Sequence, residues 1–350
     1  MQVDFLIVGQ GLAGSLLAME LIRQGSKVLV VDNGVENASK VSAGIVNPIT
    51  GTRFAKSVDA DTLLPAALGC YQQLAAFFGE CFYIDMPMYR IFSGEKEVAL
   101  CKQRLADSAY HPYLGALKQE ERNLAEFSTP SGFIEQCQTG HLLATQLLNR
   151  VKQFLVEQNC YRQLDLDYQS FQFDESVHWQ DISAKKLIFC EGYLAAQNPW
   201  FSWLPLRPAK GEVLTLAHHA QLPEAMVNYG HWWLPTSTDK VRIGATFYLD
   251  WSSLQPSEQG KQDILAAIRP YNSSIDHATI IEHQAGIRPC TQDKYPLIGI
   301  HPDNNLVAIF NGFGSKGGLQ IPFYSKRFAD FLLTEQPLPI ACNINRFQFV

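Results

Sequence analysis

The sequence has no long apolar run and no recognisable leader peptide. No stretch approaches the roughly 20 consecutive apolar residues that a membrane-spanning helix needs, so no transmembrane segment is expected. Asp4 interrupts the first apolar stretch and no basic region precedes it, which argues against a secretory signal peptide. We therefore expect a cytoplasmic protein.

Cysteine and histidine lack the spacings that hold metals or disulfides. The eight cysteines form no C-x-x-C pair and follow no repeat, which argues against a disulfide framework or a structural zinc site. The nine histidines include no H-E-x-x-H or comparable ligand spacing. We predict no metal site.

Charged residues are scarce, and the positive ones do not predominate. They make up 18% of the 350 residues against 47% hydrophobic residues, which is typical of a well-packed globular protein. With 28 lysines and arginines against 34 acidic residues, the formal net charge of -6 disfavours a nucleic acid as the main partner. The length suits two intimately joined domains.

The first thirty-two residues have the pattern of one β-α-β unit. Residues 3–8 (VDFLIV) form a short apolar run, as in a buried parallel strand. A glycine-rich turn, 9–14 (GQGLAG), precedes residues 15–24, whose apolar positions recur at helical spacing. Residues 27–31 (KVLVV) give a second strand that ends at Asp32.

The glycines of this unit match a dinucleotide-binding fingerprint. Gly9 suits the tight turn, Gly11 lets the backbone approach a pyrophosphate, and Gly14 allows close packing of helix and strand. The helix N-terminus attracts phosphates, and Asp32 would accept hydrogen bonds from ribose hydroxyls. A bare pattern also fits an ordinary glycine loop, but the complete context favours a dinucleotide. It does not choose between NAD and FAD, whereas the absence of a basic residue directly after Asp32 disfavours NADP.

The rest of the chain alternates between two kinds of pattern. Helices are predicted at 63–78, at 140–158, where leucines line one side, near 260–268, and at 322–333, with Pro322 in the first turn. Apolar strands are predicted at 186–190 and 306–310, with a glycine-rich turn at 311–318. Residues 83–92 favour short strands, and residues 207–282 favour antiparallel strands.

Several further stretches resemble one family of flavoenzymes, the D-amino-acid, glycine and sarcosine oxidases. The segment 42–48 (SAGIVNP) resembles the loop that this family runs along the isoalloxazine, and 187–194 (LIFCEGYL) its second flavin strand. Segments 208–214 (PAKGEVL) and 241–246 (VRIGAT) resemble paired strands of its substrate domain. Segments 286–299 (GIRPCTQDKYPLIG) and 312–322 (GFGSKGGLQIP) resemble its C-terminal flavin segments. Lys294 and Glu191 depart from the family pattern, and the last glycine run lacks a frequent histidine.

The resemblance implies an α/β fold with a Rossmann-like FAD-binding domain assembled from discontinuous segments, and an antiparallel-sheet substrate domain of α+β type. We assign residues 1–80, 140–206 and 284–350 to the first and 81–139 and 207–283 to the second. Bound FAD is expected to be non-covalent, because Cys290 does not fall where some sarcosine oxidases attach it. The predicted cofactor-binding residues are Gly9, Gly11, Leu12, Ala13, Gly14, Asp32, Asn33, Ser42, Ala43, Gly44, Glu191, Gly192, Gly286, Arg288, Gly312, Gly314, Ser315, Lys316 and Gly317.

Four side chains are candidates for the chemistry. Arg288 matches the family's anchor for a substrate carboxylate, and the alternative is a structural ion pair with an acid such as Asp293. Lys316 lies in the glycine turn, where it either faces the flavin or points to solvent. Trp232 and Tyr248 either line the substrate pocket or belong to the core of the sheet.

Three functions are compatible with the sequence. The first is oxidation of the C–N bond of a D-amino acid, glycine or an N-substituted glycine, with electrons passed to oxygen or to a quinone or carrier. The second is an FAD-dependent module that acts on a modified tRNA base. The third is a non-catalytic protein that binds FAD structurally or as a redox sensor.

Overall fold

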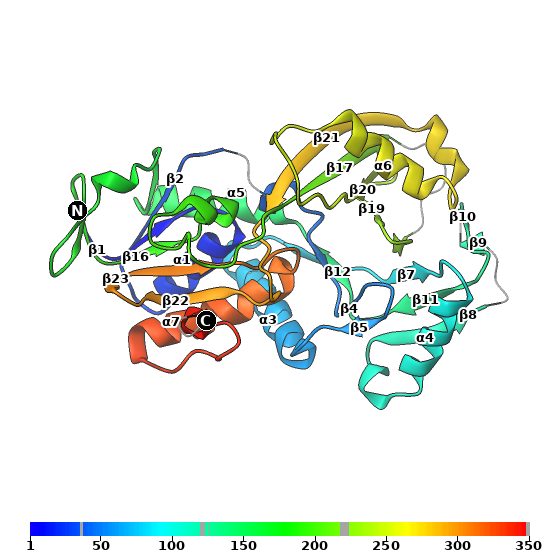
Figure 1. The fold of residues 1–350 in the computed structure, drawn as a ribbon, viewed down its shortest axis with the longest axis horizontal. Coiled ribbons are helices and arrows are strands. Elements are labelled where there is room, and N and C mark those ends of the chain that lie inside the picture. The colour runs from blue at the N-terminus through cyan, green and yellow to red at the C-terminus, as the bar shows by residue number, and fades with distance from the viewer. Residues whose placement is uncertain (36–37, 120–122, 125, 218–223, 348–350) are drawn as a thin grey trace.

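The structure, a computed structural model, describes residues 1–350 except 36–37, 120–122, 125, 218–223 and 348–350. Two parts lie side by side along the long axis (Figure 1). The part that holds both termini is built around an eight-stranded sheet, sheet A, and the other around a second eight-stranded sheet, sheet D. The predicted class, α/β with an added antiparallel sheet, is confirmed.

Sheet A joins segments from both ends of the chain and from its middle. Its central strands run parallel, and the hairpin partner of the last strand and a short hairpin beside β16 are antiparallel. Across the sheet the strands are β13 (Tyr161–Gln163), β2 (Val28–Asp32), β1 (Gln2–Val8) and β16 (Ile182–Phe189), and β16 is flanked by β23 (Asn304–Asn311) with β22 (Leu297–His301) and by β15 (Val177–Trp179) with β14 (Gln172–Phe173).

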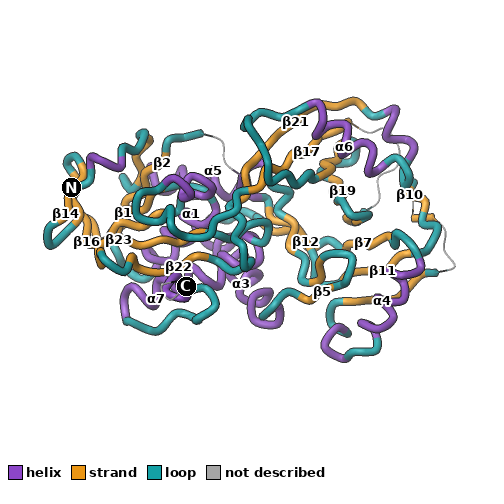
Figure 2. The backbone as a smooth tube through the Cα atoms, in the orientation of Figure 1, coloured by secondary structure: helices purple, strands orange, loops and turns teal. Residues whose placement is uncertain are grey.

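Both faces of sheet A are covered, which explains the nearly continuous apolar runs of its strands. One face is covered by a layer of four helices, in which α3 packs on α7: α1 (Leu12–Arg23), α3 (Ala60–Phe78), α5 (Ala144–Glu157) and α7 (Gly317–Thr334). Ile7 and Val30 point into this layer. The opposite face is covered by aromatic side chains such as Phe171, Trp179 and Phe201. In Figure 2 the helices accordingly gather beside sheet A.

Sheet D combines two distant stretches of the chain, joined by the one parallel pair, β18 with β7. α6 (Glu258–Ile268) packs on one face through Ile264 and Ile268. In order, its strands are β21 (Thr279–Arg288), β17 (Ala209–Ala217), β20 (Lys240–Gly244), β19 (Trp232–Pro235), β18 (Met226–Asn228), β7 (Met88–Ile91), β11 (Phe133–Gln136) and β8 (Leu114–Lys118). The predicted domain boundary between residues 283 and 284 falls inside β21.

The remaining elements are short. They are the three-stranded sheet of β3 (Ile45–Val46), β12 (Gly140–Leu142) and β6 (Tyr83–Asp85), the pairs β4 (Ile49–Thr50) with β5 (Ala55–Lys56) and β9 (Asn123–Leu124) with β10 (Phe127–Ser128), and the helices α2 (Ala38–Val41) and α4 (Glu95–Leu105), with short 3-10 turns between them.

The helix predicted from residue 140 begins four residues later. Gly140 and His141 pair with both β3 and β6, so the chain is extended there and α5 begins only at Ala144. A Cβ at Gly140 would stand 2.4 Å from the carbonyl oxygen of Ile84, so the glycine serves the strand. The apolar side predicted for the helix is nevertheless the buried one.

The last helix begins at Gly317 and not at Pro322, so the sequence prediction was wrong in its start. Pro322 lies inside α7, where it cannot donate to the carbonyl of Gly318. The buried hydroxyl of Tyr71, on α3, donates to that carbonyl at 2.6 Å instead. The tertiary contact supplies the hydrogen bond that proline removes, and residues 317 and 318 form the first turn of the helix.

Candidate active site

The glycine fingerprint forms a close strand-to-helix turn. A Cβ at Gly14 would stand 1.9 Å from the carbonyl oxygen of Gly9, and one at Gly9 would stand 2.5 Å from that of Cys190. Gly11, the N-cap of α1, has only Ser39 Oγ nearby, at 3.5 Å from a Cβ position. Gly9 and Gly14 are therefore needed for packing, while Gly11 leaves its outer side open for a ligand.

The N-terminus of α1 offers free N–H groups at this opening. The amide of Leu12 donates to Ser39 Oγ at 3.1 Å, and Gly11 provides no side-chain cap. The amides of Ala13 and Gly14 have no acceptor in the described part of the chain. Such N–H groups, together with the positive end of the helix dipole, suit a pyrophosphate.

Asp32 ends β2 beside this turn. One carboxylate oxygen accepts from the amide of Gln10 at 2.9 Å and the other from the amide of Gly34 at 2.7 Å. These bonds hold the carboxylate at the carboxyl edge of the sheet, where a ribose would lie. Asn33 is exposed, and its side chain accepts from the amide of Val35.

The segment of Ser42, Ala43 and Gly44 contacts both β12 and sheet D. A Cβ at Gly44 would stand 2.1 Å from the carbonyl oxygen of Leu142. Arg242 of β20 donates to the carbonyls of Ser42 at 2.9 Å and of Val41 at 2.6 Å. Arg242 was not among the residues predicted from the sequence, although it alternates with the buried Val241 and Ile243 and so lies on the other face of its strand.

The glycine run after β23 leads into a second open helix N-terminus. Lys316 is the N-cap of α7 without a side-chain cap, and the amides of Gly317 and Gly318 have no acceptor among the described residues. Lys316 does not point to solvent, because its Nζ donates to Ser57 Oγ at 3.2 Å, and burial lowers the pKa of Lys316. Gly312, Gly314 and Ser315 form the turn in front, and Ser315 is exposed.

Glu191 and Gly192 follow β16 at the same edge. The Glu191 side chain accepts from the Tyr168 hydroxyl and from the Asn198 amide, each at 2.8 Å. Its burial raises the pKa of Glu191 to about 7, which these two hydrogen bonds only partly offset. The side chain is thus held by the protein itself, and its backbone stays next to Gly9.

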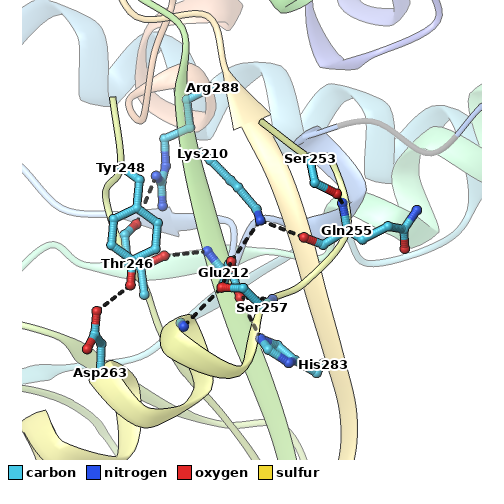
Figure 3. Close-up of polar contacts among 11 residues, drawn as sticks. Lys210, Glu212, Thr246, Tyr248, Ser253, Gln255, Ser257, Asp263, His283 and Arg288 are labelled. Atoms are coloured by element: carbon cyan, nitrogen blue, oxygen red, sulfur yellow. Dashed lines mark hydrogen bonds and ion pairs between the residues drawn. The ribbon is translucent and has the colours of Figure 1, made fainter. Parts of the chain in front are cut away.

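Arg288 lies at the end of β21, half-buried, on the face of sheet D away from α6. Its Nη1 donates to the Thr246 carbonyl at 3.1 Å, and its guanidinium lies 5.7 Å from the ring centroid of Phe247, which is 57% exposed. The expected alternative, an ion pair with Asp293, is not formed, because Arg346 pairs with that carboxylate at 2.9 Å. No described carboxylate is paired with Arg288 (Figure 3).

Strand pairing decides which aromatic side chain accompanies Arg288. Trp232 pairs with Gly244, and its Cζ2 would lie 2.9 Å from a Cβ there. Register places this pair on the same face as Arg288. Tyr248 instead pairs with Lys210, and its hydroxyl donates to Asp263 on α6 (Figure 3). The structure thus places Trp232 on the same face of sheet D as Arg288 and directs the Tyr248 hydroxyl to the face that carries α6.

A buried polar cluster fastens α6 behind this site. Glu212 of β17 is fully buried, pairs with Lys210 at 2.9 Å, and accepts from the amide and hydroxyl of Ser257, the N-cap of α6 (Figure 3). The lysine and the helix N-terminus compensate the buried charge. Because β17 pairs with β21, this cluster also holds in place the strand that carries Arg288.

Comparison with known proteins decides the family. The model of the family described as "DAO: FAD dependent oxidoreductase" matches residues 4–331. The chain belongs to this family. It is therefore an FAD-dependent oxidoreductase, and FAD is its cofactor.

Individual relatives are distant. The chain is 24% identical to the glycine oxidase of Geobacillus kaustophilus over 94% of this chain and 92% of that protein. It is 25% identical to the tRNA 5-methylaminomethyl-2-thiouridine biosynthesis bifunctional protein MnmC of Marinobacter nauticus over 95% of this chain, but spans only 55% of that protein. The crystal structure of glycine oxidase from Geobacillus kaustophilus superposes with a TM-score of 0.83 at 18% identity, covering 96% of each chain.

The residues present fit FAD. Two helix N-termini with free amides, on α1 and α7, open at the carboxyl edge of sheet A, and at Gly11 only Ser39 Oγ lies within 4 Å of a Cβ position. No three His, Cys, Asp or Glu side chains in the described ranges gather as a metal site. None of the described helices is long and apolar enough to cross a membrane.

Proposed function

We propose that this protein oxidises the C–N bond of a small amino acid: a D-amino acid, glycine or an N-substituted glycine. The observation that carries the proposal is Arg288, a half-buried guanidinium without a carboxylate partner among the described residues. Burial lowers the pKa of Arg288, yet an arginine stays charged at any ordinary pH. A substrate carboxylate would supply the missing partner in the bidentate geometry that arginine favours.

When bound, FAD supplies the acceptor for the hydride that leaves the α-carbon of the neutral amine. The side chains supply position and charge. Arg288 orients the substrate, and Trp232 lies on the same face of sheet D. Lys316 and the free amides of Gly317 and Gly318 would stabilise negative charge at the pyrimidine end of the ring system. The electrons then pass to oxygen or to a quinone or carrier.

A second candidate is action on a modified base of tRNA. It is supported by the similarity to the bifunctional tRNA-modification protein over nearly the whole of this chain. The net charge of -6 argues against it, because a tRNA backbone favours a basic surface. The third candidate is a non-catalytic FAD-binding or redox-sensing role, and no contact among the described residues favours it.

The test is anaerobic reduction of the bound flavin, followed by loss of its visible absorbance. The panel contains glycine, sarcosine, iminodiacetate, several D-amino acids, simple amines without a carboxylate, and an unfractionated tRNA. We expect a carboxylate-bearing amine to reduce the flavin fastest. Reduction by tRNA alone would favour the second candidate, and reduction by nothing in the panel the third.

The variants Arg288→Ala and Arg288→Lys test the anchor. Stranding a substrate carboxylate without its partner costs on the order of 2–5 kcal/mol, which is about 30-fold to several-thousand-fold in apparent affinity. Lysine should not rescue the site, because it lacks the planar fork. Arg269→Lys, at an exposed pair with Asp276, is the matched control. Reduction of the Arg288→Ala flavin at the wild-type rate would exclude the anchor role.

A further inference from the structure

A cavity lined by both polar and apolar side chains lies against the segment that contains Ser42 and Ala43. It has a volume of about 630 Å³, within the size range of small-molecule sites. Its walls come from β12, from α5, from the end of β19 and from Arg242 in the middle of β20. It shares Ser42 and Ala43 with the predicted flavin segment, but its lining includes none of the fingerprint glycines, Arg288 or Lys316, so it adjoins the proposed substrate site without containing the anchor.

The N-terminus of α5 opens into this cavity. Leu143, its N-cap, provides no side-chain cap, and the amides of Ala144, Thr145 and Gln146 have no acceptor in the described ranges. All three residues line the cavity. The 14-residue helix thus presents three N–H groups and the positive end of its dipole to one spot.

His141 gives an independent indication of a ligand. Its side chain lines the cavity, is only 4% exposed, and has no hydrogen-bonding partner among the residues that the structure describes. The cavity is where a partner for this imidazole, either water or a ligand, can lie. Burial, together with the nearby charge of Arg242, lowers the pKa of His141, so near neutral pH it is an uncharged imidazole that can donate one N–H.

The charges around the cavity are mostly positive. Arg242 and Arg150 face it from β20 and α5, and the buried Nη1 of Arg150 has no partner in the described part of the chain. The one acidic group in the lining, Glu80, is engaged by Arg150 Nε at 3.2 Å and by Gln146 Nε2 at 3.4 Å. Two guanidinium groups against one carboxylate leave a net positive site.

We propose that this cavity binds a small organic anion, whose carboxylate or phosphate lies at the N-terminus of α5 between His141 and Arg242. Arg242 also donates to the carbonyls of Val41 and Ser42, in the segment next to the proposed flavin position. Binding of the anion therefore changes the environment of the flavin as well as the cavity. The site adds to the proposed oxidation and does not depend on it.

The test is equilibrium binding to the FAD-bound protein, measured by calorimetry and by the flavin absorbance difference spectrum. Succinate probes the carboxylate, inorganic phosphate the phosphate, and sodium chloride at matched ionic strength serves as the reference. We expect saturable 1:1 binding of succinate or phosphate, and the tighter of the two identifies the anionic group. Binding must persist in Arg288→Ala, which separates this cavity from the substrate site.

Two variants locate the site. Thr145→Glu places a carboxylate in the exposed first turn of α5, where an acidic residue favours the helix, and it should weaken anion binding at least tenfold. His141→Gln should weaken it as well. Val156→Glu adds the same charge to an exposed position of α5 outside the cavity and should bind like wild type. Absence of saturable binding, equal affinities of Thr145→Glu and Val156→Glu, or loss of binding in Arg288→Ala would each overturn the proposal.

Discussion

The guanidinium of Arg288 lies across Gly211 on the neighbouring strand. A Cβ at Gly211 would stand 2.2 Å from Nη2 and 2.3 Å from Cζ of Arg288. The two residues belong to adjacent strands of sheet D, in which Gly211 pairs with Gly286. Because residue 211 has no side chain, the guanidinium of Arg288 can lie flat against the neighbouring strand, and this position determines where it would meet a substrate carboxylate.

Gly211→Ala should therefore impair the substrate site while FAD content stays unchanged. The added methyl group must displace the guanidinium, and misplacing a substrate by about 1 Å can cost on the order of 100-fold in rate. We expect roughly 10-fold to 100-fold lower kcat/KM for the best substrate, measured by steady-state assay with the released flavin quantified. Gly69→Ala, in α3 with no atom within 4 Å of the new Cβ, is the control. Equal activity of the two variants would contradict this reading of Gly211.

Asp32→Ala should weaken FAD binding without unfolding the protein. A hydrogen bond to a charged group is worth about 1.5–3 kcal/mol, so loss of one ribose contact should lower FAD affinity roughly tenfold or more. Asp4→Ala is the matched control, because its carboxylate also accepts a backbone amide, that of Lys27 at 2.8 Å, but at the opposite end of β1. Titration of the apoprotein with FAD compares them, and an unchanged affinity for Asp32→Ala would exclude the ribose role.

The flavin should be released by acid. Cys290 is a free, half-buried thiol, and burial raises the pKa of Cys290, so little reactive thiolate is present at neutral pH. Precipitation with trichloroacetic acid should leave the yellow chromophore in the supernatant. Colour that stays with the pellet would mean a covalent link.

Local sequence patterns predicted the elements that depend on neighbouring residues, such as the glycine turn. Gly9 and Gly14, between a strand and a helix, specify the dinucleotide turn because no side chain fits there, and Gly11 leaves the turn open for a ligand. Contacts between distant segments were not predictable. Pro322 indicated a helix start, and only the Tyr71 hydroxyl, from α3, explains how it is tolerated inside α7. Arg242 and Phe247 matter because of residues distant in the sequence: Arg242 contacts the carbonyls of Val41 and Ser42, and Phe247 lies near the guanidinium of Arg288.

Glu191 should make stability depend on pH. Its folded-state pKa of about 7 exceeds its ordinary value of 4.5, so the folded protein binds a proton more tightly than the unfolded chain. The free energy of unfolding should fall as pH rises from about 4.5 to about 7, by about 3 kcal/mol in total. Glu191→Gln should remove this slope and be relatively more stable at pH 8 than at pH 5. Urea unfolding of both proteins across this range is the measurement, and parallel pH profiles would refute the assignment.

Tyr71→Phe tests the support of α7. The variant keeps the ring, which stacks on Tyr83 at 5.7 Å between centroids, but leaves the Gly318 carbonyl without its partner inside the protein. An unsatisfied buried acceptor costs about 1–3 kcal/mol, so the free energy of unfolding should fall by that amount. Because Gly317 and Gly318 form the open N-terminus of α7, FAD affinity should fall too. Tyr83→Phe is the control, since the Tyr83 hydroxyl has no hydrogen bond to any described residue. Urea unfolding and FAD titration of both variants give the comparison. If Tyr71→Phe were as stable as Tyr83→Phe and bound FAD equally well, the hydroxyl would not be what allows Pro322 inside the helix.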